Sequence, residues 1–460
     1  MSNFNPTDEQ KAIIEPEQFS SAMIIANAGS GKTNTLVRRA INQAKQIPSW
    51  QNIAIISFTN KSADDVLKKV KQLNGSQIIA MTFHSFLLHY VLAFDKHFRN
   101  KKVGFSFANN NKSKNLQDWL DKVDSNQIMT GSTVSENDYL FEYSIYLLNN
   151  NLYIRKYLKT KFQAIYIDEA QDNNFLQYEI VELFLSFGIQ IVLVGDPKQT
   201  IYKFRGADSQ KFINMKNNQH FQNNIYELSQ NFRCHPLIDD CAKNYTIPQK
   251  NNCVQNEDTA YGVFTNFTID KIVEIFDKEK FSNEGLCFLF WKNSTNELVN
   301  SIVRKFNLIV VKEPKFIENQ ENPEYQNHLD LLFKLYFSKS VEEVYFRERF
   351  LKNIPTKLAN KLMRDFKNNL CIKTLENLNN QMDILIPEHY KAIIDCIQLE
   401  STRQFYQLDK TQNIAMTIHS AKGLEFRNVV LQKSDFKEMC KSKNEFYVAC
   451  TRAEKRLFFV

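Results

Sequence analysis

The chain has 460 residues, of which 43% are hydrophobic and 24% are charged, and its formal net charge is +7. This is the composition of a globular protein of about three domains, or of two domains with insertions. The mild basic excess permits nucleic acid as a partner without requiring it. The cysteines form no CxxC pair and no apolar run approaches the length of a membrane span, so we expect a soluble cytoplasmic protein with reduced thiols and no membrane partner.

The first half of the chain alternates as a parallel α/β sheet does. A short helix is expected first, with Thr7 as its N-cap, and apolar runs then predict strands that are each followed by a helix. These expected strands begin near residues 22, 53, 78, 164 and 189. From about residue 88 to 160 the strand signal disappears, which predicts a helical insertion within a first domain of residues 1–230.

The second half repeats this pattern. Its expected strands begin near residues 262, 286, 308, 414, 429 and 456. Residues 314–406 show helical periodicity without strand runs, which predicts a second insertion within a domain of residues 231–460. The expected fold is therefore α/β, with two parallel-sheet domains that are each interrupted by a mainly helical insertion.

A glycine-containing loop separates the first strand from a helix that is expected to begin near Lys32. A strand, a glycine loop and then Lys32-Thr33 at a helix N-terminus are typical of the phosphate-binding P-loop, although Ala26 stands where the first glycine normally lies. Lys32 is expected to reach the β/γ-phosphates of a nucleoside triphosphate, and Thr33 to bind Mg²⁺. The loop residues expected to cradle the phosphates are Ala28, Gly29, Ser30 and Gly31. The alternative, an ordinary strand-to-helix turn, is disfavoured by the flanking apolar strand.

Two adjacent carboxylates, Asp168 and Glu169, follow the apolar run 164–167. Asp168 is expected to hold Mg²⁺, and Glu169 to accept a proton from the attacking water. A solvated acidic loop is the alternative, and it is disfavoured because the pair follows a buried strand in a chain that also has a P-loop.

These features belong to an ordered series of motifs. Its members are Gln10, the P-loop, and residues 58–61, 82–85, 168–172, 195–207, 230–233, 417–426 and 447–453. In order and content the series resembles the UvrD/Rep/PcrA helicases of superfamily 1. The resemblance covers both expected sheets and implies two RecA-like domains, but it does not extend to the two insertions.

The resemblance implies roles for several residues at the ATP site. Gln10 would read the adenine edge, Phe232 would stack on the base where the family often has tyrosine, and Glu425 would contact the ribose. Gln199 would link the γ-phosphate to a DNA-facing loop. Two arginines of the second domain, Arg233 and Arg452, would act as arginine fingers on the transition-state charge. For each arginine alone, the alternative is a surface salt bridge.

The resemblance also implies a path for single-stranded DNA, along which aromatic faces stack on bases irrespective of sequence. The residues expected on this path are Phe58, Thr59, Asn60, Thr82, His84, Tyr202, Phe204, Arg205 and His419. Phe204 replaces the tryptophan that the family usually has. For His84 and His419 the alternative is a histidine packed in a core.

The second insertion departs from the family, because residues 314–406 are too few for the full domain of the large members. Compact relatives occur beside nucleases in bacterial antiphage systems such as Gabija. We therefore expect a translocase or helicase on single-stranded or tailed duplex DNA, using ATP and Mg²⁺ and moving 3′ to 5′. The alternative is a DNA-stimulated ATPase or nucleotide-sensing subunit of a nuclease-containing defence complex, with a nuclease subunit as its partner. A nucleotide-dependent RNA binder ranks last.

Overall fold

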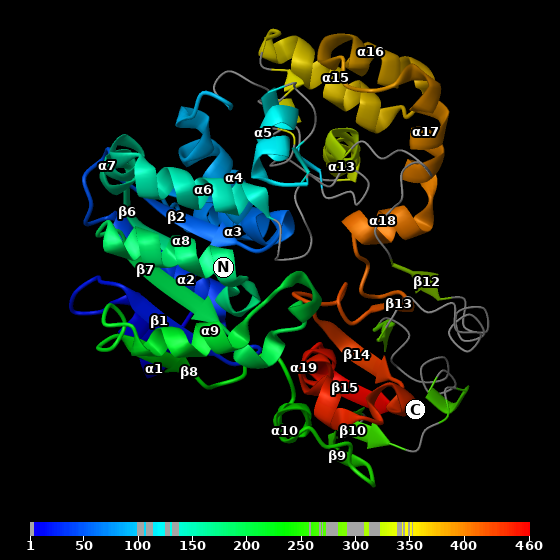
Figure 1. Ribbon diagram of the computed structural model, residues 1–460. Coiled ribbons are helices and arrows are strands. Elements are labelled where there is room, and N and C mark those ends of the chain that lie inside the picture. The colour runs from blue at the N-terminus through cyan, green and yellow to red at the C-terminus, as the bar shows by residue number, and fades with distance from the viewer. Residues whose placement is uncertain are drawn as a thin grey trace.

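The computed structural model describes residues 4–98, 105–106, 114–124, 129–130, 138–256, 259–265, 268, 270–272, 284–291, 308–311, 323–337, 343, 346–347, 350–351 and 353–460. It contains two mainly parallel β-sheets with flanking helices, and helical insertions interrupt both halves of the chain (Figure 1). Within these described ranges, no helix is both long and apolar enough to cross a membrane.

The first sheet has six strands in the order β3-β2-β6-β7-β1-β8, and all of its strand pairs are parallel. The strands are β1 (Ala22–Ala26), β2 (Asn52–Ser57), β3 (Ile78–Thr82), β6 (Phe162–Ile167), β7 (Gln190–Gly195) and β8 (Ile225–Leu228). The sequence pattern predicted five of them. It missed the edge strand β8, a four-residue strand in which only Leu228 is buried.

Helices cover both faces of this sheet. They are α1 (Asp8–Ile14), α2 (Lys32–Ala44), α3 (Asn60–Gln72), α4 (Phe83–Tyr90), α8 (Phe175–Ser186) and α9 (Ser209–Asn214). On one face, Ile24 and Ile55 of the strands pack with Leu36 of α2 and Val66 of α3. As predicted, α2 begins at Lys32, directly after the glycine loop.

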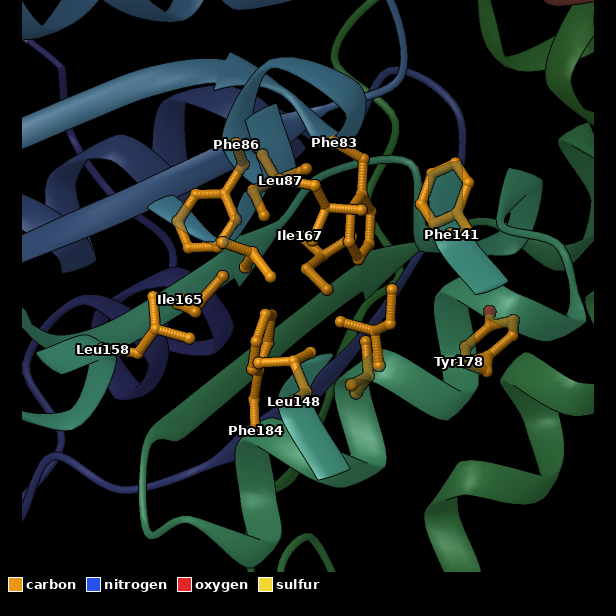
Figure 2. Packing of buried hydrophobic residues seen from close by; sticks show 14 of the residues in the cluster. Phe83, Phe86, Leu87, Phe141, Leu148, Leu158, Ile165, Ile167, Tyr178 and Phe184 are labelled. Carbon is orange, nitrogen blue, oxygen red and sulfur yellow. The ribbon is translucent and has the colours of Figure 1, made fainter. Parts of the chain in front are cut away.

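The first insertion shares its core with the other face of this sheet. Its elements are β4 (Phe105–Ser106), α5 (Leu116–Asp124), β5 (Met129–Thr130), α6 (Tyr139–Asn150) and α7 (Leu152–Lys161). Figure 2 shows Leu148 of α6 and Leu158 of α7 packed with Ile165 of β6, Phe86 of α4 and Phe184 of α8. The insertion is mainly helical as expected, but the expectation of no strand in this region was wrong, because β4 and β5 form a short parallel pair.

The second sheet has the order β12-β13-β11-β14-β15-β10-β9, and every pair except β9–β10 is parallel. Its strands are β9 (Asn252–Asn256), β10 (Thr259–Thr265), β11 (Leu286–Phe290), β12 (Ile309–Val310), β13 (Ile414–Thr417), β14 (Phe426–Leu431) and β15 (Ala453–Phe459). The antiparallel edge strand β9 was not predicted. Helices α10 (Pro236–Asn244) and α19 (Met439–Cys450) pack against each other, and their buried residues join the core of this sheet.

The second insertion has a hydrophobic core of its own. Its helices are α13 (Pro323–Phe337), α15 (Thr356–Asn368), α16 (Ile372–Met382), α17 (Tyr390–Gln398) and α18 (Glu400–Tyr406). Phe333, Phe366, Leu378 and Ile393 from four of these helices are fully buried together. In Figure 1, α15 and α16 lie at the top, whereas α18 lies next to β12 of the second sheet and contacts it. Helix α13 contacts β4 of the first insertion.

Candidate functional site

The loop between β1 and α2 turns through Gly29 (φ 72°) and Gly31 (φ 77°), both in the left-handed region that favours glycine. Gly31 is the N-cap of α2, so Lys32 and Thr33 stand in the first helical turn, where free backbone N–H groups favour an anion. A Cβ atom at Gly29 would collide with the side chain of Asn231. The glycine therefore also permits the close approach of a segment from the second half of the chain.

The carboxylates after β6 face this loop. Lys32 Nζ lies 3.2 Å from Glu169 Oε2, and Thr33 Oγ1 donates a hydrogen bond to Asp168 Oδ2 at 3.4 Å. Mg²⁺ prefers hard oxygen ligands and commonly takes one or two from the protein beside those of the phosphates. The oxygens of Thr33 and Asp168 therefore fit a magnesium site at the start of α2.

Burial and nearby charges separate the two carboxylates. Burial, and then the charge of Glu169, raise the pKa of Asp168 above its usual range. Burial also opposes ionisation of Glu169, but the charges of Lys32 and Lys422 outweigh it and hold the pKa of Glu169 below its usual range. Glu169 is thus ionised at neutral pH, as a general base must be.

Two groups from the second half of the chain bind the phosphate loop directly. The Phe232 N–H donates to the Gly29 carbonyl at 2.9 Å, and the Tyr447 hydroxyl accepts the Ala28 N–H at 3.1 Å. Tyr447 is fully buried on α19. Tyr447 opens the last motif, but its role could not be predicted from the sequence because its partner lies 419 residues away along the chain.

The residues expected around the base lie beside the same loop. Gln10 Nε2 donates to the Ser30 carbonyl at 3.1 Å, and Gln10 Oε1 accepts the Thr7 N–H at 3.1 Å, so protein groups use both ends of its amide. The Phe232 side chain is 55% exposed, which leaves its ring open to a ligand. Gln10 precedes the glycine loop in the chain and Phe232 follows it by about 200 residues. In the structure both residues contact this loop.

Both expected arginine fingers are held within the second half of the chain. Arg233 Nε donates to Glu425 Oε2 at 2.9 Å, so the ion pair considered as the alternative for Arg233 is present. Arg452 is 1% exposed and donates to the carbonyls of Val448 at 3.0 Å and Leu424 at 2.9 Å. Burial lowers the pKa of Arg452 to about 10, because burial disfavours the charged form. In this conformation neither guanidinium points freely at the phosphate loop.

Gln199 joins the nucleotide side of the site to the aromatic side. Its Nε2 donates to Asp196 Oδ2 at 2.7 Å, and its carbonyl accepts from Lys422 Nζ at 2.8 Å. Lys422 also forms an ion pair with the buried carboxylate of Asp172 and lies 4.7 Å from the centre of the Tyr202 ring. Lys422 lies within the motif 417–426, but no role was predicted for it. Only its position inside a motif indicated a functional residue, because its partners lie more than 200 residues away along the chain.

Five of the residues expected on the DNA path form one cluster. The rings of Phe58 and Tyr202 are stacked with centroids 5.0 Å apart, and the His419 ring lies 5.9 Å from Tyr202 and 5.5 Å from Phe204. The Arg205 guanidinium lies over Tyr202 and Phe204 at 5.4 and 5.6 Å. His419 Nε2 also donates to the Ile201 carbonyl at 3.2 Å, so the cluster joins both halves of the chain.

Two of the four remaining polar candidates, Thr59 and Thr82, have local partners. The hydroxyls of Thr59 and Thr82 cap α3 and α4 by accepting backbone N–H groups of Ser62 and Ser85. The side chain of Asn60 lies outside the described residues.

His84 is the last of these four polar candidates. His84 Nε2 is 3.5 Å from Asp138 Oδ2, and its ring meets Phe141 edge to face. These contacts favour the alternative of a histidine packed against the first insertion.

Comparisons with known proteins agree with the motif series. The family model of the UvrD/REP helicase N-terminal domain matches residues 6–130 and 95–220, and that of the UvrD-like helicase C-terminal domain matches residues 414–460. Gabija protein GajB of Bacillus cereus (strain VD045) is 24% identical, over 95% of this chain and 92% of that protein. ATP-dependent DNA helicase PcrA of Staphylococcus aureus (strain Mu50 / ATCC 700699) is also 24% identical, over 96% of this chain and 67% of that protein.

A crystal structure of Pif1 helicase from Candida albicans aligns with 99% of this chain and 95% of that chain, at 14% identity and with a TM-score of 0.46. The two family models match the segments that carry the P-loop, the acidic pair, the aromatic cluster and the last motifs. The chain therefore belongs to the UvrD/Rep-like helicases of superfamily 1, a family of ATP-hydrolysing enzymes.

Proposed function

We propose that this protein is an ATP-dependent translocase on single-stranded DNA that moves 3′ to 5′ and unwinds tailed duplexes. The main support for the proposal is that the short segment 196–205 connects the acidic pair to the aromatic cluster. At one end Gln199 is bonded to Asp196 beside the acidic pair, and three residues later Tyr202 begins the aromatic cluster. A strand stacked on this cluster would move Gln199 relative to the phosphates, which would make hydrolysis depend on DNA.

The chemistry follows from the groups around the P-loop. Lys32 is placed to exchange its ion pair with Glu169 for the β/γ-phosphates, which frees the Glu169 carboxylate to accept a proton from water. Thr33 and Asp168 would hold Mg²⁺, which when bound polarises the phosphoryl oxygens. The Ala28 N–H, which now donates to the Tyr447 hydroxyl, would turn to the phosphates.

The second half of the chain would supply the positive charge for the transition state. Arg233 must leave Glu425, and Arg452 must leave its backbone carbonyls, before either guanidinium reaches a γ-phosphate. Glu425 would then be released to bind the ribose hydroxyls. Hydrolysis therefore requires a rearrangement between the two halves, and that rearrangement is the step that can be coupled to movement along a strand.

We propose two domains, residues 1–230 and 231–460, with insertions at about 88–160 and 314–406. The membership of the strands supports this division, because β1–β3 and β6–β8 form one sheet while β9–β15 form the other. The nucleotide would lie between them.

A second candidate function is a DNA-stimulated ATPase that regulates a partner nuclease and unwinds little DNA itself. It is favoured by the match to Gabija protein GajB, which spans nearly the whole of both chains, whereas the match to PcrA covers 67% of that helicase. The small second insertion also favours this function, because residues 314–406 are too few for the full domain of the large helicases.

Strand displacement separates these two functions. Duplexes with a 3′ tail, a 5′ tail or no tail are incubated with ATP, Mg²⁺ and the purified protein, with and without any protein that co-purifies. The translocase proposal predicts displacement of the 3′-tailed duplex by the protein alone. ATP turnover stimulated by DNA without displacement would favour the regulatory subunit, and displacement of only the 5′-tailed duplex would overturn the proposed direction.

A further inference from the structure

A pocket of about 510 Å³ lies beside the aromatic cluster, between the two halves of the chain. Lys203 and Phe204 line it from the first half, and Trp291, His419 and Glu445 from the second. A pocket of this size holds a small planar ligand, and aromatic side chains are the usual lining for one. Trp291 and Glu445 belong to none of the sequence motifs.

Trp291 is fixed at the carboxyl end of β11. Its backbone N–H donates to Asp435 Oδ2 at 3.3 Å, and its ring packs edge to face against the ring of Phe436, with centroids 6.0 Å apart. A tryptophan held in this way keeps an aromatic surface toward the pocket at little conformational cost. Since Phe204 is 62% exposed and is smaller than the tryptophan usual in the family, Trp291 supplies aromatic area that Phe204 lacks.

Glu445 brings a carboxylate to the same pocket from α19. Its carboxylate makes no hydrogen bond or ion pair with any backbone group or side chain that the structure describes. A carboxylate only accepts hydrogen bonds, so it pairs well with an amino group on a base edge. Cytosine, adenine and guanine carry an exocyclic amino group, whereas the one ring N–H of thymine lies between two carbonyl oxygens that would repel the carboxylate.

We infer that this pocket receives one unstacked base of the DNA strand, which stacks on Trp291 and donates its exocyclic amino group to Glu445. The inference rests on the proposed function, since it assumes that single-stranded DNA follows the aromatic cluster. It goes beyond that function because stacking alone is indifferent to sequence, whereas the Glu445 carboxylate makes the enzyme discriminate against thymine.

Binding of equal-length oligo-dC and oligo-dT, measured by fluorescence anisotropy near pH 8, tests the carboxylate. We expect the parent protein to bind oligo-dC about 3-fold to 10-fold more tightly than oligo-dT, the effect of one charge-assisted hydrogen bond at a partly exposed site. Glu445→Gln, whose amide both donates and accepts, should bring this ratio close to one. The matched control Glu388→Gln changes an exposed glutamate in the second insertion and should keep the parental ratio.

Tryptophan fluorescence tests the stacking. The chain has three tryptophans, and Trp119 is buried while Trp50 is 66% exposed. In a Trp50→Phe background, oligo-dC should quench the emission, and the additional change Trp291→Phe should remove that quenching. Thermal melting of each variant verifies folding.

The outcomes show separately whether the pocket binds a base and whether the protein binds single-stranded DNA at all. If the parent protein binds both oligonucleotides equally and Trp291 emission does not respond, the pocket takes no base, yet the translocase proposal stands. If the parent protein binds neither oligonucleotide, the proposed function fails and the inference fails with it. A ratio that persists in Glu445→Gln would also overturn the role of the carboxylate.

Discussion

The ammonium group of Lys422 forms an ion pair with the carboxylate of Asp172, although 250 residues separate them along the chain. Both groups are almost completely buried. The same ammonium holds the Gln199 carbonyl and lies over Tyr202, so one side chain from the second half touches the acidic motif, the glutamine and the aromatic cluster of the first. Lys422 is therefore placed to report strand binding to the site of hydrolysis.

Replacing Lys422 by methionine should separate its structural contribution from its coupling role. The Asp172 carboxylate would be left buried without its cation, and we expect the free energy of unfolding to fall by about 3 kcal/mol. In the double variant Lys422→Met/Asp172→Asn most of that loss should return, because no buried charge remains. Stimulation of ATP turnover by DNA should stay low in both variants. Chemical denaturation and ATPase titrations measure the two effects, and full stimulation in the double variant would rule out the coupling role.

The pH dependence of stability should carry the signature of Asp172. Burial raises the pKa of this carboxyl to about 6, and the charge of Glu169 adds to the effect, although Lys422 acts in the opposite direction. In the unfolded chain the pKa is about 4. Because the folded-state pKa is the higher one, the contribution of Asp172 to stability is fully present below about pH 4 and is lost as the pH rises through about 6.

Asp172→Asn should abolish this part of the pH dependence. Between pH 4 and pH 6 the free energy of unfolding of the parent protein should change, relative to that of the variant, by about 2 to 3 kcal/mol in the direction of lower stability at higher pH. Urea denaturation of both proteins at intervals of pH measures this difference. Parallel curves would show that the Asp172 carboxyl titrates near its ordinary pKa.

Glu169→Gln should stop hydrolysis without preventing nucleotide binding. The amide preserves the size of the side chain but cannot accept a proton, so turnover should fall on the order of 10²-fold or more. Lys32 would also lose its ionic partner in the free protein, so affinity for ATP should not decrease. Fluorescent-nucleotide binding and phosphate release are measured beside Glu388→Gln, and parental turnover in Glu169→Gln would place the general base elsewhere.

The sequence predicted local features of the fold better than contacts between distant parts of the chain. The helix start at Lys32 and the glycine turn were predictable, because their determinants lie within a dozen residues. The edge strands β8 and β9 were missed, since edge strands lack a continuous apolar run. The contacts of Tyr447 and Lys422 depend on how the two halves of the chain meet, and no local pattern encodes that geometry.

The arginines and His84 show a different limit. The motifs predicted that Arg233 lies close to the P-loop, and it does. They did not predict that its guanidinium is paired with Glu425 in this conformation. A motif reports what a residue does at some stage of a cycle, whereas a structure shows the partners of one stage. His84 lies in a motif that the resemblance assigns to DNA, yet it contacts Asp138 and Phe141 of the first insertion.

An ATPase titration with an unstructured oligonucleotide tests most directly whether a strand on the aromatic cluster controls ATP turnover. The parent protein is compared with Phe204→Ala and with Phe175→Ala, a control that removes an equally exposed phenylalanine (60% against 62%) from α8. We predict strong stimulation of the parent and the control, whereas Phe204→Ala should need about 5-fold to 150-fold more DNA for half-stimulation, the equivalent of one lost stack. If DNA does not change the ATP turnover of the parent protein, or if the curves of all three proteins overlap, the aromatic cluster does not control hydrolysis.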